Sequence, residues 1–323
     1  MKSKSVTRRK FIQKTAIAGA GLPLMGTSLF NKPTDESSCI KYPVCFFSKH
    51  LQFLENYGDM ADAVLETGVE GVDLTVRPGG HVEPERVEED LPRAVEAIRK
   101  RGLLIPMMVS GINDPDDPLT ERVLKTAGQL GIDIYRMSYL KYNDSMSIEQ
   151  NLEKFSRMVK GLAELNEKYG IHGAYQNHNG NYFGGPVWDL WEVLKGLDSE
   201  WVGSQYDVRH AAVEGSGSWQ LGLSLIRPYI NCIAIKDANW EKVDGKWKPV
   251  HVPMGTGFVD HSGFLEYMKK TEFSGSITLH VEYPLYDYSD KTLTIEQKRK
   301  VSVEGIQRDA NYLKQKMKES GLV

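Results

Sequence analysis

The chain has few cysteines and no excess of positive charge. Its 323 residues include three cysteines, Cys39, Cys45 and Cys232, and no two of them have C-x-x-C spacing. This number and spacing indicate neither a zinc site nor a disulfide framework. The 40 Lys and Arg residues are outnumbered by 43 Asp and Glu residues, and the basic residues are scattered along the chain. A nucleic acid is therefore not expected as a partner.

The sequence also lacks an apolar run of the roughly 20 residues that a membrane-spanning helix requires. A shorter stretch of apolar and small residues, 15–30, follows a basic segment with the pair Arg8-Arg9. These features predict a twin-arginine signal over residues 1–30 and a polar linker over 31–41. We therefore expect a periplasmic or exported protein without a membrane span after processing. A short membrane anchor is the alternative.

After the linker, short apolar runs alternate with longer amphipathic segments. The apolar runs predict eight strands, at 43–48, 71–76, 103–110, 132–138, 172–178, 201–207, 231–237 and 276–282. The segments between them carry apolar residues at helical spacing, as in 148–170, where one face repeats at i, i+3 and i+4. Gly68, Gly102, Gly131 and Gly170 stand shortly before the next strand. Glycine at these places is typical of the left-handed turn that ends a helix.

Eight strand-helix units match a (β/α)₈ TIM barrel in number and in total length. We predict a single α/β barrel domain over residues 42–323. An open doubly wound sheet, the alternative, needs a glycine-rich phosphate turn after its first strand, and SKHLQF at 48–53 offers none. An insertion at 237–260 follows the seventh strand and carries the turn sequence Asp244-Gly245. It predicts a short hairpin over the mouth of the barrel.

Polar side chains gather at the predicted carboxyl ends of the last four strands. They are Gln176, His178, Asp207, His210, Lys236, Asp237, His280 and Glu282. Side chains alternate along a strand, so Gln176 is expected to face the same way as His178. Active sites of TIM barrels lie at this end of the barrel. One such residue alone has a structural explanation, such as a helix cap for Asp207, but the whole cluster predicts a metal site, an ionic network or a catalytic site.

Four short motifs give the chain a resemblance to a known family. They are Gln176-Asn177-His178, Asp207-Val208-Arg209-His210, Ala234-Ile235-Lys236-Asp237 and Val281-Glu282-Tyr283. In their order along the chain, they resemble the strand ends of the xylose isomerase-like TIM barrel superfamily, the sugar phosphate isomerase/epimerase group. The resemblance implies one divalent metal cation, such as Mn, Mg, Zn or Co. It also implies proton transfer next to the carbonyl group of a sugar.

The resemblance is incomplete at two of the four metal ligands. Gln176 stands where the family has Glu, and Ala234 stands where it has His. With His280 as the substitute imidazole, the implied metal ligands are Gln176, Asp207, His280 and Glu282. A neutral amide still ligates a hard cation, but the smaller charge weakens binding. In the alternative without a metal, Lys236 and the imidazoles polarise the carbonyl group.

The predicted catalytic residues are His178, His210, Lys236 and Glu282. With or without a metal, their task is to stabilise an enediolate oxygen while a base takes the carbon-bound proton. The loss of a carboxylate at position 176 favours an imidazole base, His178 or His210. Substrate contacts are predicted for Arg77, His81, Arg136, Trp188 and Trp240. The charged residues would bind hydroxyl or carboxylate groups, and the aromatic residues would bind a sugar ring.

We therefore predict an exported enzyme that acts on a small carbohydrate as an isomerase or epimerase. One alternative is a lyase or hydratase acting on an oxidised sugar such as a 3-keto-glycoside, which begins with the same proton abstraction. Export favours it, because unphosphorylated glycosides are met outside the cytoplasm. The other alternative is a sugar-binding barrel without catalysis. The identity of the substrate and the oligomeric state stay open.

Overall fold

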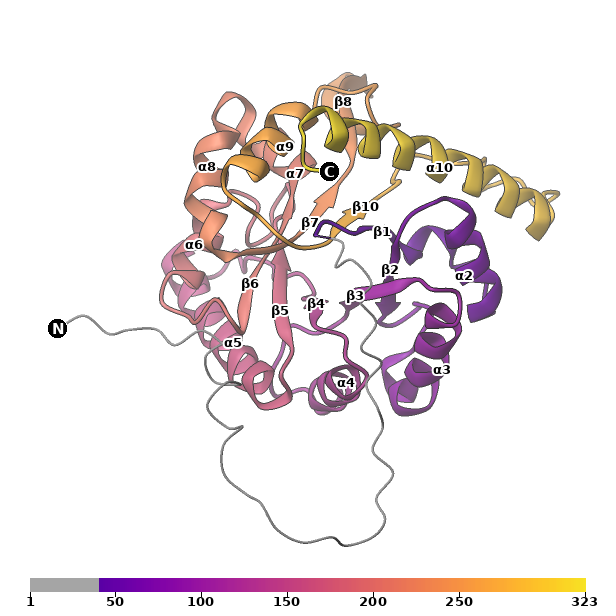
Figure 1. Cartoon of the computed structure of the whole chain (residues 1–323). Coiled ribbons are helices and arrows are strands. Elements are labelled where there is room, and N and C mark those ends of the chain that lie inside the picture. Colours follow the sequence, from indigo (N-terminus) through magenta and orange to yellow (C-terminus); the bar gives the residue numbers. More distant parts are fainter. Residues whose placement is uncertain (1–40) are drawn as a thin grey trace, which may run out of the picture. The chain divides into compact units, whose positions relative to one another are not determined.

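The computed structural model describes residues 41–323, and within them eight parallel strands close into a barrel (Figure 1). Neighbouring strands follow one another in the order β1-β10-β7-β6-β5-β4-β3-β2. The barrel strands are β1 (Val44–Phe47), β2 (Gly71–Val76), β3 (Leu104–Ser110), β4 (Ile134–Arg136), β5 (His172–Gln176), β6 (Val202–Asp207), β7 (Ile230–Ile235) and β10 (Ile277–Leu279). Each of them lies on a predicted apolar run, which confirms the predicted TIM barrel.

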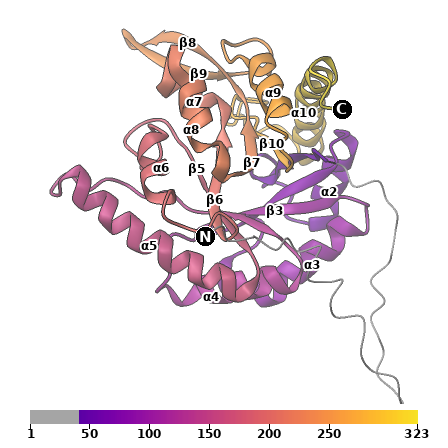
Figure 2. The ribbon, with the colours of Figure 1, turned by 60° about the vertical axis from the view of Figure 1, so that its left-hand side comes forward.

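Helices surround the strands on the outside of the barrel (Figures 1 and 2). They are α2 (Tyr57–Glu66), α3 (Val87–Arg99), α4 (Pro118–Gln129), α5 (Ile148–Tyr169), α6 (Trp188–Leu194), α7 (Val208–Gly215), α8 (Trp219–Ile226), α9 (His261–Lys270) and α10 (Ile295–Glu319). In α5, Ser147 and Gln150 form a capping box at the start, and Gly170 adopts φ 65° at the end. The other three glycines that were predicted to end helices also have positive φ.

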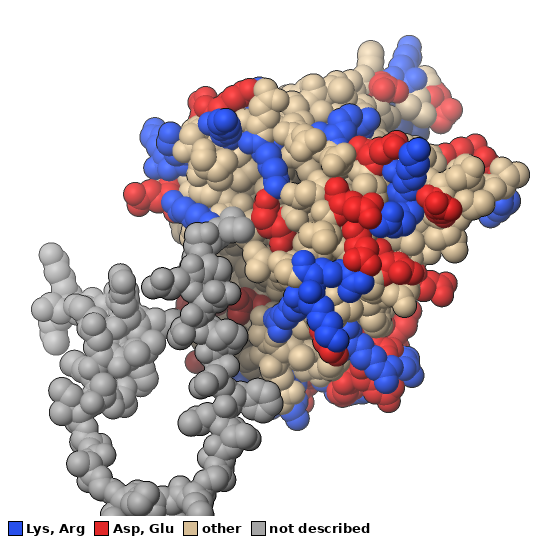
Figure 3. Space-filling model, turned by 45° about the vertical axis from the view of Figure 1, so that its right-hand side comes forward, with Lys and Arg blue, Asp and Glu red and all other residues tan. Residues whose placement is uncertain are grey.

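The predicted signal segment at 1–30 and the linker up to residue 40 lie outside the described residues. Export and the start of the domain at residue 42 therefore stay predictions. Among the helices of residues 41–323, none is long and apolar enough to cross a membrane. On the face drawn in Figure 3, positive and negative side chains are interspersed.

The core lies inside the barrel and between its strands and the helices. Strands β1, β2 and β6 are buried along their whole length, as expected for parallel strands that are covered on both faces. Met107, Ala174 and Cys232 pack together as a small cluster of their own. Both Cys45 and Cys232 are buried free thiols.

Three barrel strands end before polar residues that were predicted to belong to them. Strand β5 ends at Gln176, β7 ends at Ile235 and β10 ends at Leu279. His178, Lys236, His280 and Glu282 therefore lie in the segments that follow these strands, and Asp237 begins the hairpin strand β8. The alternation of side chains along a strand, which was used to predict their directions, does not apply to them.

The insertion after β7 forms an antiparallel hairpin of β8 (Asp237–Val243) and β9 (Lys246–Val252), as predicted. Asp244 and Gly245 in its turn have φ of 51° and 75°, the conformation of a type I′ turn. The Asp237 carboxylate holds the base of the insertion. It accepts hydrogen bonds from the backbone N–H groups of Ala238, Gly255, Gly257 and Val259. Asp237 thus shapes the loop and is not one of the residues that line the cavity described below.

Candidate active site

A polar cavity of about 170 Å³ lies at the carboxyl ends of the barrel strands. Its lining residues are Phe47, Lys49, Arg77, Arg136, Tyr139, Gln176, His178, His210, Lys236, His251, His280 and Glu282. They come from the ends of β1, β2, β4, β5, β7 and β10, from α7 and from the hairpin strand β9. The position is that of TIM barrel active sites.

A network centred on Asp207 fixes the floor of this cavity. Asp207 ends β6 and is fully buried, and its Oδ2 lies 3.0 Å from Lys236 Nζ. The same oxygen accepts a hydrogen bond of 2.7 Å from Gln176 Nε2. Asp207 Oδ1 accepts from the backbone N–H of His210 at 3.0 Å, so this residue also caps α7, as the structural explanation of Asp207 predicted. The result is a buried carboxylate with one cation and two N–H donors.

The amide of Gln176 extends the network towards β4. Its Oε1 accepts hydrogen bonds from Arg136 Nη1 at 3.0 Å and from the Tyr139 hydroxyl at 2.6 Å. Its NH₂ group faces Asp207. An amide suits this place because it accepts on one side and donates on the other. A glutamate here would instead bring two carboxylates together.

The predicted metal ligands do not fit a divalent cation. Within residues 41–323, no group of three or more His, Cys, Asp or Glu side chains is placed to hold a metal ion. The Asp207 carboxylate is bound by the Lys236 ammonium, and Lys49 Nζ lies 2.9 Å from Glu282 Oε2. The Gln176 oxygen already accepts two hydrogen bonds. Cationic and N–H donors thus bind the oxygens that the resemblance assigned to the metal, so the predicted set is not assembled.

His178 lines the cavity and is half-buried. Its Nδ1 lies 2.8 Å from the backbone carbonyl oxygen of Asn179. A carbonyl only accepts, so Nδ1 carries the proton and Nε2 keeps a free lone pair. Burial, and next the charge of Lys236, lower the pKa of His178 below its ordinary value. The ring is therefore neutral at pH 7, as a general base requires.

The other predicted imidazoles are more deeply buried. The His210 ring lies 3.9 Å from the His178 ring, centroid to centroid, and its Nδ1 contacts Asn179 Oδ1. His280 stacks on Phe47 with ring centroids 4.6 Å apart, and neither of its ring nitrogens has a hydrogen-bond partner. Burial, and next the charge of Lys236, hold the pKa of both residues well below the ordinary value. Both rings are therefore neutral at pH 7.

Glu282 is the carboxylate that lines the cavity directly. Besides Lys49, its neighbours are His280 Nδ1 at 3.8 Å and His50 Nε2 at 4.0 Å. Desolvation raises the pKa of Glu282, but the charges of Lys236 and other neighbours outweigh it and hold the pKa well below its ordinary value. The group is ionised at pH 7 and is a weak proton acceptor. Its geometry suits balancing the cations better than carrying a proton.

The sequence of the chain matches the profile of a known protein family. The profile described as "Xylose isomerase-like TIM barrel" matches residues 61–315. The chain belongs to the xylose isomerase-like TIM barrel family. No curated protein matches its sequence significantly.

Solved structures share this barrel at low sequence identity. The xylose isomerase domain protein of Planctomyces limnophilus has a TM-score of 0.64 at 15% identity, over 88% of this chain and 100% of that chain. D-psicose 3-epimerase of Clostridium cellulolyticum H10 has 0.63 at 12%, over 85% and 99%. The 3-keto-D-glucoside 4-epimerase of E. coli has 0.63 at 13%, over 85% and 100%. At these identities the likeness shows the fold, and the activities are those of the named proteins.

Three residues that were predicted to bind substrate do not line the cavity of this family member. His81 sits in the loop after β2, where its Nδ1 lies 3.0 Å from Thr75 Oγ1. Trp188 begins α6 and is 57% exposed, and Trp240 on β8 is 46% exposed and stacks on Phe258. Aromatic residues at helix starts and on hairpins have packing roles that sequence alone does not separate from ligand binding. Arg77 and Arg136 do line the cavity, and their contact with a substrate stays a prediction.

Four lining residues were not among the predicted site residues. Phe47 and Lys49 end or follow β1, and Tyr139 follows β4; their place after a strand was the available signal. His251 lies on β9, where Arg209 Nη2 donates to the neighbouring Pro249 carbonyl at 3.2 Å. It is the histidine of the predicted insertion, so its position over the mouth was a usable signal. Burial lowers the pKa of His251 to about 4.

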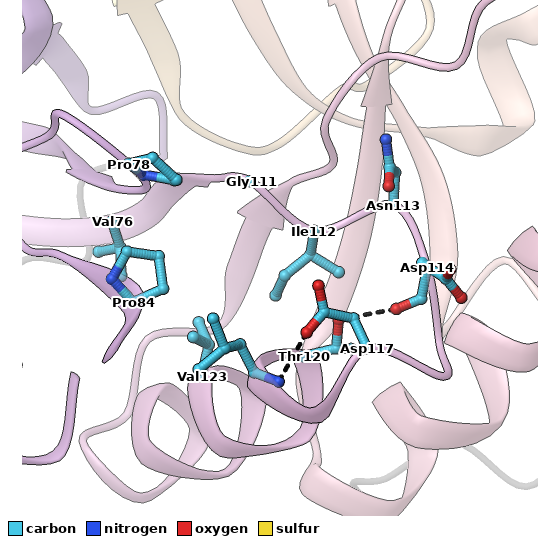
Figure 4. A pocket seen from close by; sticks show the side chains of 11 residues that line it. Val76, Pro78, Pro84, Gly111, Ile112, Asn113, Asp114, Asp117, Thr120 and Val123 are labelled. Atoms are coloured by element: carbon cyan, nitrogen blue, oxygen red, sulfur yellow. Dashed lines mark hydrogen bonds between the residues drawn. The ribbon is translucent and has the colours of Figure 1, made fainter. Parts of the chain in front are cut away.

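A second hollow of about 90 Å³ lies beside the barrel mouth, between the end of β2 and the start of α4 (Figure 4). Its wall includes Val76, Ile112 and Val123, and its acidic side belongs to the cap of α4. There Asp117 Oδ1 accepts from the backbone N–H of Leu119 at 2.8 Å. Its lining residues include no histidine, lysine or arginine. The polar cavity is therefore the candidate active site.

Proposed function

We propose that the chain is a sugar isomerase or epimerase-like enzyme that moves a proton on the carbon next to a carbonyl group. The observation that carries this proposal is one cavity in which a neutral imidazole with a free Nε2 faces fixed cations. His178 supplies the imidazole, and Lys236 and Arg136 supply the charges. This is the pair of functions that enolisation needs, a base and an oxyanion stabiliser.

The reaction balances with groups of this chain. His178 Nε2 takes the proton from the carbon, and the electrons of the C–H bond form the carbon–carbon double bond of an enediolate. The carbonyl oxygen gains the negative charge, which the cations stabilise. Delivery of a proton from solvent to the opposite face of the same carbon, with His178 passing its own proton to solvent, completes an epimerisation. Return of the abstracted proton to the neighbouring carbon, with a hydroxyl proton passing between the two oxygens, completes an isomerisation.

The cations are held in place before the substrate binds. The ammonium of Lys236 is fixed by Asp207, and the guanidinium of Arg136 is fixed by Gln176. Charges held in this way stabilise an oxyanion without reorganisation during the reaction. The site thus supplies through its own side chains the charge that the resemblance assigned to a divalent cation, and no step needs a metal ligand set that the residues do not form.

Solvent exchange tests the proposal directly. The purified protein is incubated in D₂O with ketoses and 3-keto-glycosides, and deuterium on the carbon next to the carbonyl is followed by NMR. We expect exchange that EDTA does not change, and its loss in His178→Ala. Trp240→Ala, exposed and outside the cavity, is the matched control and should exchange at the wild-type rate. Elimination products would favour the lyase, and binding of a sugar without any exchange would favour the binding protein.

Export of the chain is a separate proposal. It is supported by the basic segment with Arg8 and Arg9 before the apolar stretch at 15–30. We expect the wild-type protein in the periplasmic fraction of its host. Changing both arginines to lysine should keep it in the cytoplasm, and equal export of the two forms would contradict the twin-arginine assignment.

A further inference from the structure

Two guanidinium groups in the cavity have no carboxylate partner. Both lysines of the cavity are paired with carboxylates, whereas within residues 41–323 neither Arg77 nor Arg136 forms an ion pair with Asp or Glu. Arg136 is only 5% exposed and donates from Nη1 to the neutral amide of Gln176. Its Nε is buried and has no hydrogen-bond partner among residues 41–323. Burying charge without a counter-charge is costly, and in this part of the chain no carboxylate forms an ion pair with either arginine.

Both guanidinium groups face the same aromatic ring. The Cζ atoms of Arg77 and Arg136 lie 5.7 and 5.6 Å from the centroid of Phe47. The Arg136 Cζ atom also lies 5.2 Å from the centroid of Tyr139. Contacts of this kind offset part of the desolvation but bring no negative charge. Burial, and next the charge of Arg136, lower the pKa of Arg77, as expected for two like charges held close together.

We propose that Arg77 and Arg136 bind a carboxylate of the substrate, and hence that the substrate is a sugar acid. This inference rests on the proposed function, because it places the acid group in the cavity where the carbonyl chemistry occurs. A planar carboxylate accepts paired hydrogen bonds from guanidinium groups. It would supply the missing counter-charge.

The charge of the cavity favours an acid over a neutral sugar, and the position of the arginines favours a carboxylate over a phosphate. The two lysine–carboxylate pairs cancel, which leaves the two arginines. Transfer of the proton to His178 forms the enediolate and an imidazolium together, so the net charge of the site depends on the charge of the substrate alone. A carboxylate supplies one negative charge to the two arginines, whereas a neutral sugar supplies none. TIM barrels also bind phosphate mostly at the loops after strands seven and eight, whereas Arg77 follows β2 and Arg136 ends β4.

Besides Glu282, Asp73 is an acidic group close enough to Arg77 to influence its pKa. It lies on β2, is fully buried and forms no ion pair with either arginine. Desolvation raises the pKa of Asp73 to about 7. At neutral pH it therefore supplies at most part of one negative charge, which leaves a place for an anionic ligand.

The test compares sugars that differ at one carbon. Binding of D-glucuronate, D-glucose and D-glucose 6-phosphate to the purified protein is measured by calorimetry, with the galacto and manno series in parallel. We expect one uronate to bind about 10- to 100-fold more tightly than its neutral sugar, and more weakly as salt rises. Arg77→Gln and Arg136→Gln should each remove this preference. Arg136→Lys keeps the positive charge but loses the paired N–H donors of the guanidinium group. It should therefore keep only part of the preference for the uronate.

Arg93→Gln is the matched control, because Arg93 is 69% exposed on α3 and its loss changes the net charge equally. It should bind uronate like the wild type, and circular dichroism checks the fold of each variant. Equal binding of neutral sugars, tighter binding of the phosphate, a preference that survives in folded Arg77→Gln, or no binding of any uronate would each overturn the proposal.

The result also separates this inference from the proposed function. In one outcome, uronate binding depends on both arginines but no sugar acid exchanges deuterium. This outcome supports the carboxylate site and contradicts the proposed enolisation. Exchange in neutral ketoses with no preference for acids keeps the enolisation and removes the carboxylate site.

Discussion

Replacing Lys236 with methionine tests the centre of the proposed site. The Lys236 ammonium lies 3.0 Å from Asp207 Oδ2, and the two side chains are 5% and 0% exposed. Methionine keeps most of the side-chain volume and removes the charge, so the Asp207 carboxylate stays buried without its cation. Loss of one partner of a buried pair costs about 3–5 kcal/mol. Two N–H groups still bind Asp207, so we expect a loss of about 3 kcal/mol in the free energy of unfolding.

The same change should slow the reaction and shift its pH dependence. Loss of one fixed group that stabilises an oxyanion lowers the rate about 10²- to 10³-fold. The charge of Lys236 also contributes, after burial, to the lowered pKa of His178. Without it the pKa of His178 rises. The rate requires neutral His178, so its fall on the acid side should begin at a higher pH than in the wild type.

Urea unfolding and deuterium exchange across pH measure both effects in one set of proteins. Lys168→Met is the matched control, because Lys168 pairs with Glu121 at 2.6 Å but is 58% exposed; it should change neither stability nor rate. The double change Lys236→Met with Asp207→Asn removes the unpaired charge and should recover part of the lost stability. A folded Lys236→Met protein with the wild-type rate and pH profile would refute the assignment of Lys236 to the enediolate.

Three further predictions follow from the geometry. His178→Ala should lower exchange by about 10²- to 10⁴-fold with the fold intact, and a wild-type rate would remove His178 from the site. Glu282→Gln should lower the rate at least about tenfold, because a charge-assisted contact with Lys49 is lost; an unchanged kcat would leave Glu282 without a role. The free energy of unfolding should fall as the pH drops from about 6.5 to about 4. Burial lowers the pKa of His50 and His81 to about 4, so each binds a proton on unfolding, with a slope of about 1.4 kcal/mol per pH unit and proton. Urea midpoints that do not change with pH in this range would contradict the predicted loss of stability.

The barrel could be predicted because its signals are local and repeated. Each strand is an apolar run that is covered on both faces, and glycines such as Gly102 and Gly170 end helices with positive φ. The ends of the strands were less predictable. Strand β10 stops at Leu279 although the apolar pattern continues to Val281, because where pairing with neighbouring strands stops is set by tertiary contacts.

The cluster at the strand ends was predicted, but its internal connections were not. The sequence places Asp207 and Lys236 at neighbouring strand ends, yet their pairing depends on side-chain directions after the strands have ended. The same holds for Tyr139, which reaches Gln176 from the segment after β4. The metal ligands were predicted by resemblance, and that prediction did not hold because Lys236 binds the Asp207 carboxylate that a cation would need.

The hairpin of β8 and β9 forms one wall of the polar cavity, and residues at or after the ends of the barrel strands form the rest of it. Asp237 anchors its base to backbone N–H groups, an attachment that depends little on the other side chains of the insertion. His251 reaches the cavity from β9, whereas the base and the cations come from other segments. In the proposed enzyme, a substitution at His251 would change the wall of the cavity while His178, Lys236 and Arg136 stay in place. For engineering, His251 is the residue to vary first.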